Sequence, residues 1–186
     1  MLEDRPRMKT YKESLEDNKE LLKDKIVIDV GAGTGILSIF AARAGARHVY
    51  AIEFSETAKM AVKVIAENGL SDRITVIQKR AEDVELGVDI KEQADAIVSE
   101  WMGYCLLYES MLESVLSVRD RLLKPGGLMF PERARICVAG LDHESAKRNY
   151  DSVWVNNEYG IKMTCMKESS DRFIAIDWLY PDAVVT

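Results

Sequence analysis

The chain has 186 residues, of which 47% are hydrophobic, and its formal net charge is −6. This length is enough for one domain, or for one domain and part of another. The acidic balance disfavours a direct nucleic-acid-binding protein, which normally presents a basic face, and it suits cationic partners such as arginine-rich peptides.

The cysteines and histidines are few and scattered: Cys105, Cys137, Cys165, His48 and His143. An odd number of cysteines without a visible secretory leader indicates free thiols in a reducing compartment, so we expect a cytosolic or nuclear protein. The two histidines lie at no metal-site spacing, so we expect no metal. No apolar run approaches the roughly 20 residues of a membrane span, so we expect no membrane partner.

The first elements along the chain alternate in type. Residues 8–24 carry dense charge with sparse leucines, which is typical of a surface helix. Residues 25–30 form a short apolar run that predicts a buried strand, and residues 36–44 predict a helix that stops at Gly45. Residues 48–52 predict a second strand.

A second helix is predicted to begin after Ser55, a good N-cap residue, and to end at Asn68-Gly69. Its apolar residues recur with the helical period and should face the core: Ala58, Ala61, Val62 and Ile65.

The alternation continues to residue 130. The sequence predicts strands at 74–77, 94–99 and 128–130, a helix at 110–123 and a turn at 124–127. Strands that alternate with helices predict an α/β fold, a Rossmann-like parallel sheet built from βαβ units.

The pattern changes after Pro131, so we expect one domain at 1–131 and a different one at 132–186. Residues 135–141 predict a strand of another sheet, and residues 142–150 predict a polar helix. The last stretch is rich in aromatic residues: Tyr150, Trp154, Tyr159, Phe173, Trp178 and Tyr180. Such large apolar groups need a surface to pack on, and a second protomer could supply it.

A glycine-rich loop lies between the first strand and the next helix, with Asp29, Gly31, Gly33 and Gly35 at every second position. Glycines there allow a tight turn and a close approach of a ligand to the backbone. A dinucleotide fingerprint would need glycine where Ile36 stands, so a dehydrogenase is disfavoured. A Walker A loop is excluded because no Gly-Lys-Ser/Thr follows.

Two acidic positions follow the next strands. Glu53 ends the second strand, where an acidic side chain can accept both ribose hydroxyls. Glu82 and Asp83 follow the third strand, and either carboxylate could accept from an adenine amine or lie in a solvated turn.

The loop after the fourth predicted strand carries two glutamates, Glu100 and Glu109, nine residues apart. Two carboxylates there either serve acid/base chemistry or hold a cation. The loop favours the second, because it has aromatic residues that suit a flat group and no Ser/His or Cys/His pair. Trp101 and Tyr104 could form walls for a flat cationic group, or they could be packed core.

These motifs resemble those of the protein arginine methyltransferases, a family of class I methyltransferases. The segment 99–111 is similar to the family's double-glutamate loop at essentially every position, and the Asp29–Leu37 segment resembles its S-adenosylmethionine loop. The similarity extends over roughly residues 1–180, and it also covers Ala44-Gly45-Ala46, Arg119-Asp120 and Phe130-Pro131. It implies a cofactor domain followed by the start of a β-barrel and a dimerisation arm at 150–163, with the family's N-terminal helix and most of its barrel missing.

The resemblance implies transfer of a methyl group from S-adenosyl-L-methionine to arginine in glycine/arginine-rich segments or histone tails, by a homodimer. It implies catalytic Glu100 and Glu109. The implied cofactor-binding residues are Arg7, Asp29, Gly31, Gly33, Gly35, Glu53 and Glu82, with Arg7 pairing with the cofactor carboxylate. The implied substrate pocket contains Trp101, Met102, Tyr104 and Met111, and Met111 favours asymmetric dimethylation.

Two alternatives remain from the sequence. The chain could bind cofactor and self-associate without turnover, as an incompetent fragment of such an enzyme. It could also be a small-molecule methyltransferase on the same fold, although neutral substrates do not need two carboxylates.

Overall fold

The computed structural model describes residues 4–137. One compact unit is Met1–Arg135, and the other, Ile136–Thr186, falls almost wholly outside the described residues. Outside the described residues also lie Cys165, the predicted helix at 142–150 and the predicted dimerisation arm at 150–163. The predicted boundary after Pro131 stays a prediction. Within the described part, no helix has the length and apolar character needed to cross a membrane.

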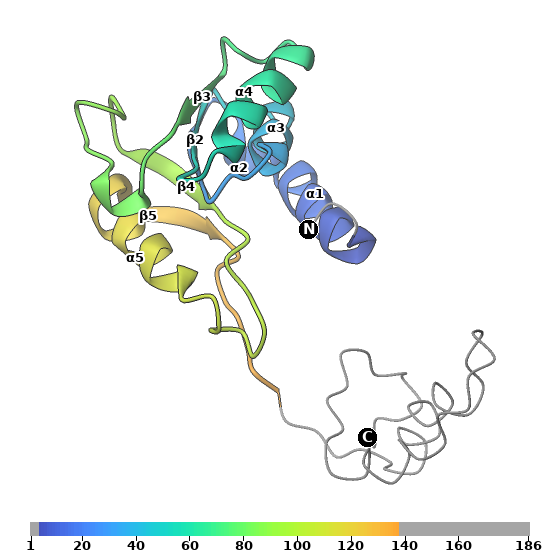
Figure 1. The fold of residues 1–186 in the computed structure, drawn as a ribbon. Helices are drawn as coiled ribbons and strands as arrows, with labels where there is room; N and C mark the ends of the chain where they lie inside the picture. Colours follow the sequence, from blue (N-terminus) through green and yellow to red (C-terminus); the bar gives the residue numbers. More distant parts are fainter. Residues whose placement is uncertain (1–3, 138–186) are drawn as a thin grey trace, which may run out of the picture. The chain divides into compact units, whose positions relative to one another are not determined.

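The core of the first unit is a sheet of five parallel strands in the order β3-β2-β1-β4-β5 (Figure 1). The central strand β1 pairs with β2 on one side and β4 on the other, with Ile28 opposite both Tyr50 and Ile97. From β1 the chain adds strands outward on one side, to β3, and then crosses to add β4 and β5 on the other side. Open α/β sheets bind their ligands at the carboxyl ends of the strands beside this point of reversal. The strands are β1 (Ile26–Val30), β2 (His48–Ile52), β3 (Ile74–Ile77), β4 (Ala94–Val98) and β5 (Leu123–Phe130).

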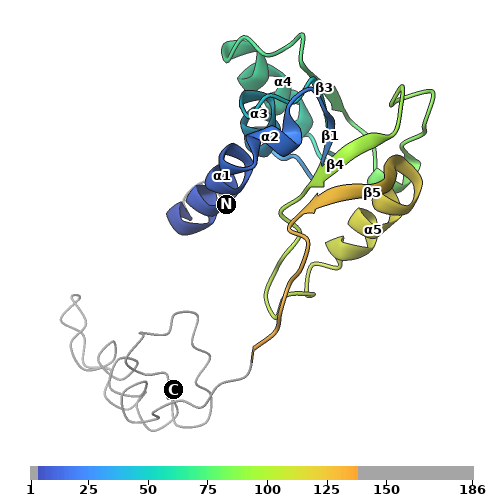
Figure 2. The same ribbon diagram turned by 180° about the vertical axis from the view of Figure 1, so that it is seen from behind.

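Helices cover both faces of this sheet (Figures 1 and 2). On one face, Val27 packs with residues of α1 (Arg5–Asp17), α3 (Ile36–Arg43) and α4 (Thr57–Glu67). On the other, Ile26 and Ile28 pack with α5 (Met111–Leu122). Alternate residues of a strand point to opposite faces, so a strand buried on both must be apolar throughout, as β1 nearly is.

The predicted α/β fold is confirmed, and β2 and β3 have the predicted bounds. The predicted helix at 8–24 is two helices, α1 and α2 (Lys19–Leu22), which meet at Asn18. The predicted turn at 124–127 is wrong, because these residues belong to β5 with a register shift opposite Ala94/Ala96. β5 is an edge strand, where proline and glycine interrupt no second ladder.

Two details of α4 also differ from the prediction. The N-cap residue is Glu56, although the Ser55 hydroxyl still accepts a hydrogen bond from the backbone N–H of Thr57 at 3.2 Å. Val62 is not a core residue, since 52% of it is exposed, whereas Ala58, Ala61 and Ile65 are buried. The face of α4 that is buried against the sheet is therefore narrower than the face that carries apolar residues.

Helix α1 is tied to the end of β4. Asp4 caps it by accepting a hydrogen bond from the backbone N–H of Arg7 at 3.0 Å. The buried Tyr11 hydroxyl donates to the carbonyl of Ser99 at 2.8 Å, and Leu15 is fully buried. These contacts bring the first turn of α1 to the loop that carries Glu100.

Neighbouring leucines on α2 provide a test of this packing. Leu22 is fully buried and Leu21 is 50% exposed. We expect Leu22→Ala to lower the free energy of unfolding by about 2–5 kcal/mol, because it leaves a cavity in the core. Urea unfolding measures it, with Leu21→Ala as the matched control. Equal losses for the two variants would contradict the burial of Leu22.

Candidate functional site

The glycine-rich loop runs from the end of β1 to the start of α3. Gly31 and Gly35 have positive φ angles of 73° and 83°, which L-residues with side chains rarely adopt. Gly31 also has a close neighbour, since a Cβ atom there would lie 2.1 Å from the terminal methyl carbon of Met111. The backbone of the loop is thus in direct contact with the first residue of α5.

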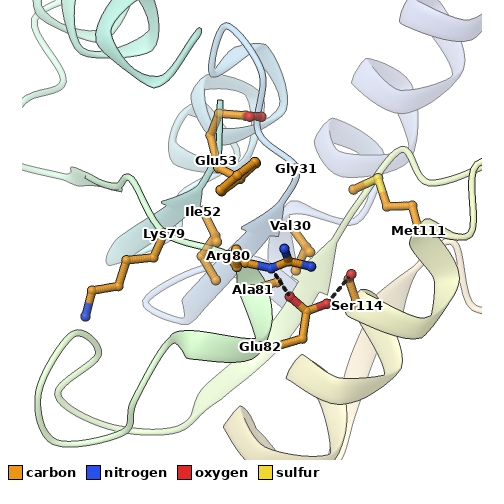
Figure 3. Close-up of a pocket in the computed structure, with 11 residues that line it drawn as sticks. Val30, Gly31, Ile52, Glu53, Lys79, Arg80, Ala81, Glu82, Met111 and Ser114 are labelled. Carbon is orange, nitrogen blue, oxygen red and sulfur yellow. Dashed lines mark hydrogen bonds and ion pairs between the residues drawn. The ribbon is translucent and has the colours of Figure 1, made fainter. Parts of the chain in front are cut away.

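A cavity of about 340 Å³ opens beside this loop, at the carboxyl ends of β1 and β2. Figure 3 shows its lining, with Glu53 on one side, Glu82 and Ser114 on the other, and Met111 reaching in from α5. The full lining is Val30, Gly31, Ile52, Glu53, Phe54, Lys79, Arg80, Ala81, Glu82, Met111 and Ser114. The structure therefore brings together four of the predicted site residues: Gly31, Glu53, Glu82 and Met111.

Glu53 is held by the backbone around it. One carboxylate oxygen, Oε2, accepts a hydrogen bond from the N–H of Gly33 at 2.8 Å, and Oε1 accepts from the N–H of Ser55 at 2.7 Å. These bonds join the glycine-rich loop to the end of β2 and orient the carboxylate. Each oxygen retains a second lone pair that can accept a hydroxyl.

Glu82 lies in the short 3-10 turn η1 (Ala81–Asp83). The hydroxyl of Ser114 donates to Oε1 of Glu82, and this hydrogen bond is the main reason that the pKa of Glu82 lies below its usual value. The sequence left Glu82 and Asp83 as alternatives, and only Glu82 lines the cavity.

Sequence reasoning missed two residues that line this side of the cavity, Ser114 and Arg80, and one that holds η1 in place, Arg121. Ser114 was detectable, because it follows Met111 by three positions and so shares its helix face. Arg80, which lies 5.6 Å from the ring centroid of Phe54, and Arg121 carried no sequence signal. Arg121 donates to the carbonyls of Val84 at 2.7 Å and Ala81 at 2.9 Å, which holds η1 against α5.

Asp29 lies beneath the loop and does not line the cavity. Its side chain is fully buried, with Oδ2 accepting from the Ser38 hydroxyl at 2.7 Å and Oδ1 without a hydrogen-bond partner. Burial disfavours the charged form and raises the pKa of Asp29 to about 7. Its predicted direct role in cofactor binding stays a prediction.

The raised pKa of Asp29 predicts a pH-dependent stability. In the unfolded chain this carboxyl titrates near ~3.9, and in the folded protein near about 7. The folded state thus binds the proton more tightly, and this stabilisation is present below pH ~4 and is lost as the pH rises towards 7. As the pH rises across that range, we expect the free energy of unfolding of Asp29→Asn to increase by a few kcal/mol relative to that of the native chain. Urea unfolding at several pH values measures this difference. A difference in stability between the two proteins that does not change with pH would contradict the raised pKa of Asp29.

Glu100 lies two residues beyond β4, and its side chain is only 14% exposed. Its Oε2 atom accepts from Nη1 of Arg7 at 3.2 Å, while Oε1 is buried without a hydrogen-bond partner. Arg7 also pairs with Asp4, at 3.0 Å. A buried carboxylate oxygen without a donor is energetically costly, so this position can accept a further cationic donor. The predicted pairing of Arg7 with a cofactor carboxylate stays a prediction.

The rest of the double-glutamate loop divides into buried and exposed parts. Trp101 is 6% exposed and belongs to the core under α5, whereas Tyr104 is 74% exposed. Of the two alternatives for these residues, packed core therefore describes Trp101 and not Tyr104. Met102 contacts the core on both faces of the sheet, and Glu109 is exposed with its side chain against Gly103.

Comparison with known proteins identifies related sequences and structures. Residues 27–127 match the family model described as "Methyltransferase domain". The chain is 48% identical to protein arginine N-methyltransferase 8-B of Danio rerio over 186 residues, covering all of this chain and 43% of that protein. It is 49% identical over 168 residues to protein arginine N-methyltransferase 1 of Schizosaccharomyces pombe, covering 90% of this chain and 48% of that one.

One solved structure is similar to this chain in sequence and in fold. The Trypanosoma brucei PRMT1 enzyme-prozyme heterotetrameric complex with AdoHcy superposes with a TM-score of 0.79 at 42% identity, covering 100% of this chain and 57% of that one. The chain thus spans less than two thirds of the length of each of these three relatives.

Proposed function

We propose that the chain, which belongs to the family described as "Methyltransferase domain", is a protein arginine N-methyltransferase that transfers a methyl group from S-adenosyl-L-methionine to a substrate arginine. The relatives that are 48% and 49% identical to it carry this name. The cavity between the glycine-rich loop and η1 is the proposed cofactor site, and the loop from Glu100 to Glu109 is the proposed arginine site.

The residues around the cavity fit this cofactor. Gly31 lines the cavity without adding a side chain to it, and the position that its Cβ atom would take is filled by the terminal methyl of Met111. Glu53 is oriented by two backbone N–H groups and can accept ribose hydroxyls. Glu82 is held by Ser114 at the opposite side and can accept from an exocyclic amine. A volume of about 340 Å³ is in the range of small-molecule sites.

When bound, S-adenosyl-L-methionine supplies an electrophilic methyl group on a cationic sulfur. The protein has to hold a guanidinium, which is always charged and planar, in line with that methyl group. Glu100 and Glu109 can accept charge-assisted hydrogen bonds from it and offset the repulsion between two cations. As the guanidinium nitrogen gains the methyl group it loses a proton, and a carboxylate of this pair can accept that proton and pass it to water.

The observation that carries this proposal is the Oε1 atom of Glu100. This oxygen is buried and has no hydrogen-bond partner. The other oxygen of the same carboxylate already accepts a hydrogen bond from the guanidinium of Arg7. A second guanidinium would supply the missing donor, and arginine is the protein side chain that offers paired donors in one plane.

We further propose arginine in glycine/arginine-rich segments and histone tails as the substrate, since an acidic protein attracts cationic chains. The position of Met111 in the cavity lining supports asymmetric dimethylation as the product type. We also propose a homodimer formed through the arm at residues 150–163.

The test is to incubate the full chain with methyl-labelled S-adenosyl-L-methionine and a glycine/arginine-rich peptide. Label recovered as methylated arginine in the peptide is the expected result. A lysine-for-arginine version of the same peptide should remain unlabelled. Labelling of both peptides, or of neither, would contradict arginine transfer by this chain.

A second candidate function is cofactor binding without turnover. It is favoured by the lining of the cavity, which includes Glu53 and Glu82 but neither Glu100 nor Glu109. Calorimetry distinguishes the two candidates: binding of S-adenosylhomocysteine without transfer to the peptide would support the second.

A further inference from the structure

The loop between β4 and α5 is folded tightly on itself. The N–H of Gly103 donates to the carbonyl of Leu106 at 3.2 Å, and the N–H of Leu106 donates back at 2.9 Å. Cys105, Leu106 and Ser110 have positive φ angles of 48°, 65° and 54°. Such conformations are costly for residues with side chains, so the surrounding contacts must hold the loop in this shape.

Within this loop the side chain of Glu109 lies against the backbone of Gly103. A Cβ atom on residue 103 would lie 2.6 Å from Cγ, 2.9 Å from Cδ and 3.0 Å from Oε1 of Glu109. Carbon atoms in ordinary contact are about 3.5–4.0 Å apart. The φ angle of Gly103 is not in the left-handed region. Glycine is therefore needed here for space and not for its backbone freedom.

We propose that Gly103 is a positioning residue for Glu109: its missing side chain provides the space in which the Glu109 carboxylate is held for a substrate guanidinium. This proposal rests on the proposed function, which makes Glu109 one of the two arginine-binding carboxylates. Gly103 itself touches no substrate and acts only through the glutamate that packs on it.

The first test is Gly103→Ala. The added methyl group must move the Glu109 side chain by about 1 Å to reach ordinary contact distance, and a displacement of that size can cost about 100-fold in rate. We expect kcat for the arginine peptide to fall by about that factor while the affinity for S-adenosylhomocysteine stays within about twofold, because the cofactor cavity is lined by other residues. Gly69→Ala is the control, since residue 69 has open space around it.

The second test is a double-mutant cycle with Glu109→Ala. Alanine at 109 lacks Cγ, Cδ and Oε1, the three atoms that a Cβ atom at 103 would meet. In the Glu109→Ala background we expect Gly103→Ala to cost less than about threefold in kcat, against about 100-fold in the native background. Equal factors in the two backgrounds would mean that Gly103 acts through general structure, and would overturn the proposal.

A third measurement separates this proposal from the proposed function. The carboxyl ¹³C resonance of Glu109, assigned by its disappearance in Glu109→Gln, should shift in Gly103→Ala and not in Gly69→Ala, without any substrate. An unshifted resonance would overturn the positioning role. If the native chain transfers no label to the peptide and the peptide leaves this resonance unmoved, the proposed function fails instead.

Discussion

Glu109→Gln is expected to lower methyl transfer to an arginine peptide by at least about 10³-fold while leaving cofactor affinity within about twofold. Glutamine keeps the shape of the side chain but removes its negative charge, so it cannot form an ion pair with a guanidinium. It also cannot accept the proton that leaves the nitrogen. Glu109 is exposed and does not line the cofactor cavity, which is why binding should survive.

The matched control for this variant is Glu113→Gln. Glu113 is also exposed, lies one turn further along and undergoes the same change of charge. Single-turnover transfer and calorimetry with S-adenosylhomocysteine measure the two quantities separately. A Glu109→Gln variant that loses cofactor binding, or one that keeps its transfer rate, would remove Glu109 from the proposed arginine site.

Gly31→Ala is expected to weaken cofactor binding by about 100-fold, equivalent to about 2.8 kcal/mol. The added Cβ atom would lie 2.1 Å from the terminal methyl of Met111, so it must push this methyl away from the loop. Gly31 and Met111 both line the cavity, so the added Cβ atom and the displaced methyl would change the shape of the proposed cofactor site.

Gly69→Ala is the matched control for Gly31→Ala. It puts alanine into the same kind of left-handed backbone conformation, but its Cβ atom meets no neighbouring atom. Gly31 and Gly69 both have a positive φ angle, 73° and 66°, but no atom lies within 4 Å of the Cβ position at residue 69. Both variants should lose about 1–2 kcal/mol of stability, and only Gly31→Ala should lose affinity. Similar affinities for the two variants in calorimetry would show that the cofactor does not approach the glycine-rich loop.

Part of the cavity lining was predictable, because these residues occupy defined positions relative to strands. Glu53 and Gly31 each follow a parallel strand directly, and parallel strands that start at one edge must end at the other. The two residues therefore lie at the same edge of the sheet, where both line the cavity. Ser114, Arg80 and Arg121 were not predictable in this way, since they meet the cavity or η1 through contacts between elements far apart in sequence.

The same difference explains the errors in the fold. The predicted turn at 124–127 was inferred from proline and glycine, whose local preference for turns is real but is overridden when an edge strand tolerates them. The burial of Val62 was inferred from its helical spacing, but spacing predicts a direction and not the width of the face that the sheet covers.

By itself the sequence determined the fold class and the order of the elements, because periodicity and glycine spacing are local properties of the chain. Only the tertiary structure decided that Asp29 is buried beneath the loop, that Arg7 pairs with Glu100, and that Glu109 packs on Gly103. The Arg7 contact spans 93 residues. The contact of Glu109 is local, but it depends on a loop conformation that no local preference favours, since Cys105 and Leu106 both have positive φ angles.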